Sequence, residues 1–190
     1  MKRYVLLIFL NIPFLLYAQI LTISELIKIK NSDIGELTEL LEIKKFALGS
    51  AEYDTLILEV KLDSTKKWQN MKVTYNPPSD WKYKEYRFYK NGNADNAEYF
   101  VNVIINRNRI SPSSLVYQFP GEKYSTIRES ILKNGFIKSR AYEERGEIVT
   151  VFRNNKYEIE LVNSPDREQN LKGEYFNTGR RTYYLVLVNN

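Results

Sequence analysis

Two stretches of the chain, residues 33–53 and 123–143, share one order of hydrophobic and polar positions at an offset of ninety residues. Each begins with apolar residues at helical spacing, continues through an aromatic residue and ends in an extended run. The aligned pairs are Leu37 with Ile127, Glu39 with Glu129, Leu41 with Ile131, Phe46 with Phe136 and Ala51 with Ala141. This pattern indicates a helix-plus-sheet unit that is used twice, as an internal repeat.

The first of these helices has a recognisable start. Asp33 followed by Glu36 has the spacing of a capping box, in which two side chains satisfy free backbone donors at the helix N-terminus. We expect the helix to run to about Phe46 and to be ended by Gly49. A shorter helix is expected before it, within residues 20–30.

The second helix is expected over residues 122–134. Gly135 follows it directly, where a left-handed C-terminal cap favours glycine. The apolar stripe that this helix turns toward a core consists of Tyr124, Ile127, Ile131 and Leu132.

Alternation of apolar and polar residues predicts many strands, and the 15 Tyr, 9 Phe and 2 Trp favour sheet in the same way. We expect strands at residues 55–62, 71–75, 81–89, 98–106, 115–119, 136–144, 147–153, 157–162 and 183–188. Val101, Val103 and Ile105 are expected to be buried. A polar loop with Pro165 and Gly173 precedes the last strand, whose apolar character favours a central place in the sheet.

The predicted class is α+β, with tandem helix plus antiparallel β-meander units in a β-rich chain. The connection at residues 107–114 separates a first unit at 19–113 from a second at 114–190. The two units form either one continuous sheet with the helices on one face or two separate sheets.

Residues 1–18 have the layout of a signal peptide. Lys2 and Arg3 precede an apolar run at residues 5–16, and the small residue Ala18 stands before Gln19. The run is shorter than the roughly 20 residues that cross a bilayer, so cleavage near Ala18–Gln19 is favoured over an uncleaved anchor. We therefore expect a periplasmic or secreted protein without a stable membrane span after processing.

Composition restricts the chemistry. The chain of 190 residues has no cysteine and no histidine, which removes disulfides, thiol nucleophiles and the commonest metal ligand. We expect no metal and no cofactor. Removal of Lys2 and Arg3 lowers the net charge from +5 to +3, too little to dominate binding to a polyelectrolyte, so nucleic acid is not expected as a partner.

The segment at residues 81–90, WKYKEYRFYK, interleaves aromatic and basic side chains. Tyrosine, tryptophan and arginine often contribute most of the binding energy of a protein interface, and exposed aromatic rings also stack on sugars. The alternative is an outer strand whose lysines deter edge-to-edge pairing while its rings pack inward. The candidate binding residues are Trp81, Tyr83, Tyr86, Arg87 and Tyr89.

Carboxylates offer the main route to catalysis. Glu158 and Glu160 share one face of a predicted strand, and Glu143, Glu144 and Glu147 flank a predicted turn. Glycoside hydrolases use two such groups, one of them kept protonated by burial, but the surrounding residues do not predict burial. Residues 64–67 match the S-x-x-K pattern of serine acyl-transfer enzymes, without the other motifs of those enzymes.

Two segments carry a resemblance. Ser24-Glu25-Leu26-Ile27 before the capped helix, and Val116-Tyr117-Gln118 before the helix that ends at Gly135, resemble parts of small exported bacterial proteins that have no assigned activity. The twofold helix-plus-sheet plan is similar in outline to secreted β-lactamase inhibitor proteins, which hold another protein on a sheet surface. The expected function is a non-catalytic exported module that binds an envelope or secreted protein. A histidine-free carboxylate-based glycan hydrolase and a glycan-binding module are the alternatives.

Overall fold

The computed structural model describes residues 20–53, 81–169 and 175–190. The predicted signal segment, the predicted strands at 55–62 and 71–75 and the tetrad at 64–67 lie outside these residues. Within them the helices are α1 Ile23–Asn31, α2 Ile34–Ile43 and α3 Tyr124–Lys133, with a 3-10 turn at Gly121–Lys123. The strands are β1 Ala47–Tyr53, β2 Tyr83–Lys90, β3 Tyr99–Asn106, β4 Ser114–Phe119, β5 Ile137–Glu144, β6 Glu147–Arg153, β7 Tyr157–Gln169 and β8 Tyr175–Asn189.

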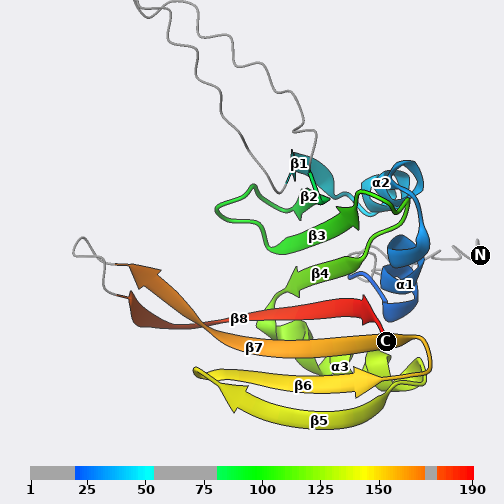
Figure 1. Ribbon diagram of the computed structural model, residues 1–190. Coiled ribbons are helices and arrows are strands. Elements are labelled where there is room, and N and C mark those ends of the chain that lie inside the picture. Colours follow the sequence, from blue (N-terminus) through cyan, green and yellow to red (C-terminus); the bar gives the residue numbers. More distant parts are fainter. Residues whose placement is uncertain (1–19, 54–80, 170–174) are drawn as a thin grey trace, which may run out of the picture.

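The strands form one antiparallel sheet of order β1-β2-β3-β4-β8-β7-β6-β5 (Figure 1). The first four strands make one meander and the last four another, and the two meanders meet where β4 pairs with β8. This confirms the predicted α+β class and answers the question of one sheet or two. β4, at the boundary between the two predicted units, pairs with β3 on one side and β8 on the other.

The central place predicted for the last strand is confirmed, because β8 lies between β4 and β7. Both β7 and β8 are longer than predicted. Pro165 lies within β7 and not in a loop, next to a shift in the pairing register between Pro165 and Arg167. A register shift of this kind is where a strand tolerates proline, because a ladder hydrogen bond is already missing there.

The corresponding elements of the two meanders follow the ninety-residue offset closely. α2 and α3 have ten residues each and begin ninety residues apart. Each is followed by a buried phenylalanine, Phe46 or Phe136. β1 and β5 then both shift register two residues into the strand, between Leu48 and Ser50 and between Lys138 and Arg140.

Local signals explain where the helices begin. Asp33 accepts a hydrogen bond from the backbone N–H of Glu36 at 3.0 Å, which is one half of the capping box predicted there; among the described residues, the Glu36 side chain does not bond back to the Asp33 N–H. A complete capping box lies at α1, where the Thr22 side chain accepts from the Glu25 N–H and the Glu25 carboxylate accepts from the Thr22 N–H at 2.8 Å.

Two details of the predicted helices are wrong. α2 ends at Ile43, because Lys45 adopts φ 68° and turns the chain out of the helix, so Gly49 lies in β1 instead of ending the helix. Gly135, with φ 79°, is in the left-handed conformation as predicted. Leu132 does not belong to the buried stripe of α3, since 46% of it is exposed.

All three helices pack on the same face of the sheet. Their buried side chains form one hydrophobic cluster with alternate residues of the strands, among them Phe88, Val101, Val103, Ile105, Leu115, Tyr117, Ile159, Leu161, Leu185 and Leu187. The predicted burial of Val101, Val103 and Ile105 is confirmed. In the described part of the chain, no helix is long and apolar enough to span a membrane.

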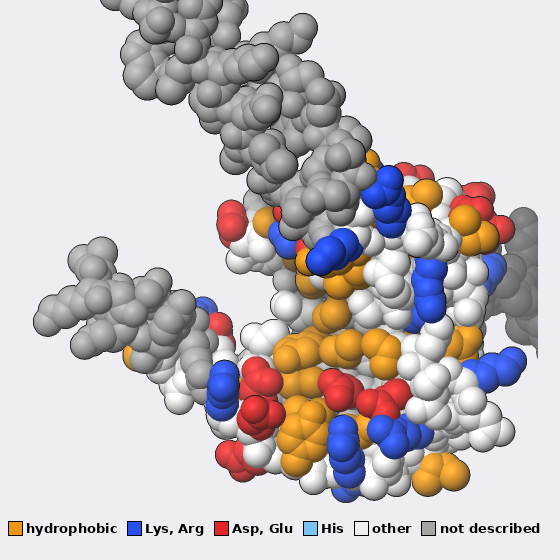
Figure 2. Space-filling view, in the orientation of Figure 1, with side chains coloured by type: hydrophobic (Ala, Val, Ile, Leu, Met, Phe, Trp, Pro, Cys, Tyr) orange, Lys and Arg blue, Asp and Glu red, His pale blue; other side chains and the backbone are white. Residues whose placement is uncertain are grey.

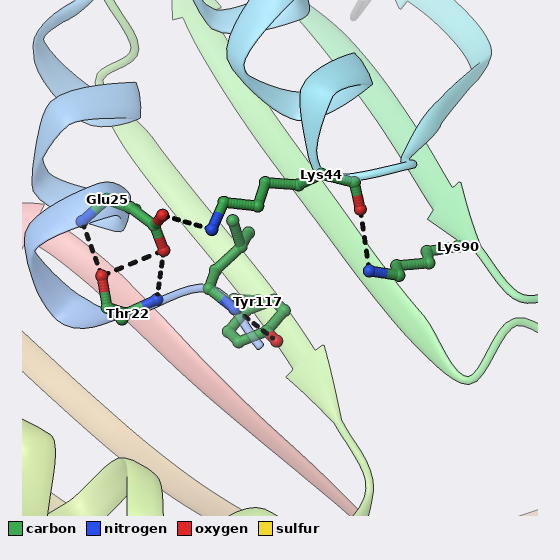
Figure 3. Close-up of polar contacts among 6 residues, drawn as sticks. Thr22, Glu25, Lys44, Lys90 and Tyr117 are labelled. Carbon is green, nitrogen blue, oxygen red and sulfur yellow. Dashed lines mark hydrogen bonds and ion pairs between the residues drawn. The ribbon is translucent and has the colours of Figure 1, made fainter. Parts of the chain in front are cut away.

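Polar contacts fasten this helical layer to the sheet (Figure 3). Glu25 of α1 pairs with Lys44 after α2 at 2.5 Å. Lys90 of β2 donates to the Lys44 backbone oxygen at 2.7 Å, and the Tyr117 hydroxyl of β4 accepts from the Leu21 N–H at 3.3 Å. These bonds join residues far apart in the chain, so they fix how α1 and α2 lie on β2 and β4.

Candidate functional site

The other face of the sheet carries no helix in the described residues, and we call it the open face. Side chains alternate between the two faces of a strand, so every second residue of all eight strands points to it. Figure 2 shows hydrophobic side chains gathered over the middle of this face and charged side chains over the strands below them. Strands about 4.8 Å apart make an eight-stranded face roughly 34 Å wide.

The pairing register aligns the residues of the open face in three rows that cross the whole sheet. The central row is Ser50, Arg87, Asn102, Val116, Val186, Glu160, Val151 and Arg140. An aromatic row on one side is Ala47, Tyr89, Phe100, Gln118, Tyr184, Val162, Val149 and Tyr142. A row of mixed charge on the other side contains Glu52, Glu85, Ile104, Val188, Glu158, Arg153 and Ile137.

The aromatic row places rings on strands of both meanders. Tyr89 and Phe100 stack with ring centroids 5.3 Å apart. Tyr184 of β8 packs against a small cluster of Val149, Val151 and Val162, which are buried although no described helix covers them. Burial raises the pKa of the Tyr184 phenol, and the nearby charges of Glu147 and Glu160 raise it further. The row therefore presents aromatic rings of both meanders, and the Tyr184 phenol among them is held in its protonated form.

Arg87 is the charged centre of the β2 end of the face. Its guanidinium bonds Glu85 at 2.9 Å and lies 3.8 Å from Glu52 of β1. Glu85 also accepts from Asn102 at 2.7 Å. The hydrogen bond from Arg87 lowers the pKa of the Glu85 carboxyl against the opposing effect of burial, and the same pair raises the pKa of Arg87. Both partners are firmly ionised.

These groups line a shallow hollow of about 420 Å³ on the open face. It continues from β2 across β3 to β4 and is bounded by the loop after β2. Its lining includes Glu85, Arg87, Tyr89, Phe100, Asn102 and Gln118. The hollow therefore combines a stacked aromatic pair with an ion pair and two amide side chains.

The alternation of β2 divides the predicted binding residues. Tyr83, Arg87 and Tyr89 belong to the open face, since they pair with Asn106, Asn102 and Phe100. Tyr86 lies on the helix-covered face, where it packs against the core. Trp81 lies just before β2 with its ring edge-on to Tyr53, 5.3 Å between centroids, and lines a separate hollow with Arg107 and Arg109.

The lysines of β2 also point away from the open face. Lys90 is 3% exposed and reaches the end of α2, and Lys84 lies over the rings of Tyr53 and Tyr86 at 4.9 Å and 4.8 Å. The basic character of the open face at β2 therefore comes from Arg87. Within the rows, carboxylates outnumber guanidinium groups, so this face is more acidic than the chain as a whole.

The sequence analysis missed the open-face residues contributed by other strands, Phe100, Val116, Tyr142, Tyr184 and Val186. Phe100, Val116, Tyr184 and Val186 alternate with buried core residues in their own strands, which is a visible signal, whereas all of β5 around Tyr142 is exposed. The alignment of Tyr142, Tyr184 and Val186 with Tyr89 and Arg87 depends on the pairing of β4 with β8, which local sequence patterns do not specify.

The carboxylates considered for catalysis are either paired or dispersed. Glu158 is hydrogen-bonded to Arg153, and Glu147 accepts from Ser164 at 2.7 Å. The cross-strand neighbours Glu52 and Glu85 share Arg87, and the lowered pKa of Glu85 is the opposite of what a general acid needs. In residues 20–53, 81–169 and 175–190, no group of three or more acidic side chains is placed to hold a metal.

The open face is thus a broad surface with aliphatic and aromatic side chains at its centre and both signs of charge around them. Its hollow is shallow, and the carboxylates beside it are held ionised by Arg87. Comparison of the chain with protein-family models, with curated proteins and with solved structures finds no match.

Proposed function

We propose that this chain is a non-catalytic, exported binding module that holds a protein partner on the open face. One observation carries the proposal. Half-buried apolar and aromatic side chains of the central strands, among them Val116, Tyr184 and Val186, lie on a face that no described helix covers. A contiguous apolar surface bordered by polar residues is typical of a protein interaction site.

The size and composition of the open face support a protein partner. A stable interface covers about 800 Å² on each partner. A face roughly 34 Å wide reaches that area with three rows of side chains. Tyrosine and arginine are enriched among the residues that dominate binding energy, and the hollow combines Tyr89 with Arg87. The sheet holds these groups rigidly, so little conformational entropy is lost when they bind.

A glycan hydrolase has less support. Retaining and inverting enzymes both need one protonated carboxyl close to an ionised one. Glu85 and Glu52 are near each other, but the ion pair with Arg87 keeps Glu85 ionised. Glycan binding without hydrolysis shares the aromatic signal, so the experiment below separates it from protein binding.

Export is part of the same proposal. A signal segment at residues 1–18 would release a mature chain that begins at Gln19, four residues before α1. Mass spectrometry of the protein purified from the producing cells measures the N-terminus directly. We expect Gln19 as the first residue, and an intact Met1 in soluble protein from the cytoplasm contradicts export.

Site-specific photo-crosslinking in the producing cells tests the binding proposal. A photoreactive residue at Tyr184 probes the open face, and one at Glu129, on the exposed side of α3, is the matched control. We expect protein adducts from position 184 that are absent from position 129. Val186→Arg and Arg87→Ala in the probe-bearing chain should reduce these adducts, because they place a charge in the apolar centre or remove the ion pair of the hollow.

Three outcomes contradict the proposal. Equal adducts at both positions show that the open face has no special role. Adducts that persist in Val186→Arg place the contact elsewhere. Adducts that resist proteases but disappear after glycosidase treatment identify a glycan and not a protein.

A further inference from the structure

Glu160 occupies an unusual place in the open face. It is the fourth residue of β7, and its cross-strand neighbours are Val151 of β6 and Val186 of β8. The residue is half-buried, and Val162 follows it two positions later on the same face. A carboxylate is thus set into the apolar centre of the surface.

Two cations at neighbouring positions of the open face are already engaged. Arg153 of β6, two residues after Val151 and on the same face, is hydrogen-bonded to Glu158. Arg140 of β5 lies over the ring of Tyr142, 5.4 Å from its centroid. The other titratable groups that face it are Glu147, Glu158 and Tyr184, and its charge contributes to the raised pKa of Tyr184.

Among the described residues, no hydrogen bond or ion pair reaches the Glu160 carboxylate. A charge that is partly removed from water and left unpaired disfavours the folded state. Valine or threonine would fill the same strand position without that cost. The position therefore has a cost to folding that a contact from outside the chain can offset.

We infer that the partner inserts a lysine or arginine side chain at Glu160, flanked by apolar side chains that pack on Val151, Val186 and Tyr184. This inference rests on the proposed function and specifies the chemistry of the protein partner. The excess of carboxylates over guanidinium groups in the three rows complements such a cationic segment. The flanking valines exclude water, which strengthens the ion pair in the complex.

Selection from a random peptide library displayed on phage, against the immobilised mature chain, tests the inference without knowledge of the natural partner. We expect enriched peptides to contain lysine or arginine next to aliphatic or aromatic residues. Their binding should weaken about tenfold or more in Glu160→Gln. It should also weaken as salt is raised, whereas Glu143→Gln, on the exposed edge strand β5, should bind as the parent does.

The variants separate the inference from the proposed function. Peptides that lose binding in Val186→Arg but keep it in Glu160→Gln overturn the inference and leave the open face as the binding surface. Peptides that bind Val186→Arg and the parent equally contradict the open face itself. Enrichment of peptides without basic residues, or no enrichment, also overturns the inference.

A measurement on the chain alone gives a second readout. If Glu160 is retained for a partner, Glu160→Val should raise the midpoint of thermal unfolding, because it removes an unpaired charge from an apolar setting. A lower midpoint indicates that the carboxylate serves the fold, and that result overturns the inference.

Discussion

Tyr117 shows how one hydroxyl group connects the helical layer to the sheet. The side chain is fully buried in the centre of β4, its ring lies nearly parallel to that of Tyr99, and its oxygen accepts a hydrogen bond from the Leu21 N–H before α1. Burial raises the pKa of the Tyr117 phenol well above its ordinary value, and the bond from Leu21 only partly opposes this. The folded state therefore favours the protonated form of the Tyr117 hydroxyl.

Tyr117→Phe should change how stability depends on alkaline pH. In the parent, the folded chain keeps a proton that the unfolded chain loses above about pH 10, so stability falls by up to about 1.4 kcal/mol per pH unit beyond that point. The variant lacks this loss. At pH 7 it should be less stable by about 1 kcal/mol, because the Leu21 N–H loses its acceptor.

Urea unfolding at pH 7 and at pH 11 measures both effects. The stability difference between parent and Tyr117→Phe should shrink or reverse at the higher pH. Tyr142→Phe, on the exposed edge strand β5, is the control for loss of a phenol. A constant difference across the pH range contradicts the role given to burial of Tyr117.

At the residue scale, the sequence predicted which types of residue lie at the candidate site better than it predicted which face of the sheet each side chain points to. Arg87 and Tyr89 were predicted as binding residues and do lie on the open face. Tyr86 and Lys90 were in the same interleaved segment, but alternation turns them toward the helices. A one-residue change of register would exchange the two sets, and the buried Phe88 and Lys90 hold the observed one.

The ends of α2 and α3 use one backbone geometry with different residues. Lys45 and Gly135 stand at corresponding positions with φ 68° and φ 79°. Glycine adopts this conformation without steric cost, whereas a residue with a Cβ pays roughly 1–2 kcal/mol. A Cβ added at Gly135 would meet nothing within 4 Å, so the cost there belongs to the backbone alone.

Exchange of these residue types should have opposite effects. Lys45→Gly should stabilise the protein by about 1 kcal/mol, and Gly135→Ala should destabilise it by a similar amount. Glu39→Gly, at an exposed position in the middle of α2, is the control and should destabilise by about 1 kcal/mol, since glycine weakens a helix interior. Chemical denaturation measures all three, and a loss of stability in Lys45→Gly contradicts the argument.

At the element scale, the sequence predicted most helices and strands, because their signals are local. Periodicity located β2, β3 and the strands from β5 to β7, and the glycine after α3 marked its end. The end of α2 was placed at Gly49 because glycine is the usual signal there. Instead, Lys45 adopts the left-handed conformation that ends the helix. Lysine has no preference for this conformation, so the sequence does not predict it.

At the scale of the whole molecule, the two meanders are joined into one sheet by long-range contacts. β4 and β8 pair along six residues of each strand. α1 lies across the junction, since Ser24 donates to Asn134 after α3 at 2.8 Å and Lys30 donates to the Pro112 backbone oxygen at 2.7 Å. Burial lowers the pKa of the Lys30 ammonium, and the charge of Arg109 lowers it further.

The sequence could predict most strands of the two meanders but not their junction. Edge-to-edge pairing of β4 with β8 brings together segments about seventy residues apart, and either strand could also have remained an edge. The open face exists because of that junction. Its central row needs Val116 from one meander beside Val186 from the other, so the candidate site could not be assembled from local patterns.

One shared core predicts one cooperative unfolding transition. Leu161 of β7 is fully buried in the cluster that also contains residues of α1, α2 and β2. Trp81, just before β2, lies edge-on to Tyr53 of β1 with ring centroids 5.3 Å apart, so its fluorescence reports on the first meander. Leu161→Ala leaves a cavity in the second half and should cost about 2–5 kcal/mol.

Tryptophan fluorescence and far-ultraviolet circular dichroism, followed together during urea unfolding, measure this coupling. We expect Leu161→Ala to lower the midpoint of both signals equally, because the two halves lose their common core at once. Glu129→Ala on the exposed surface of α3 should leave both midpoints nearly unchanged. If the fluorescence midpoint stays at the parent value while the dichroism transition splits, the two units unfold separately and the junction of β4 with β8 does not couple them.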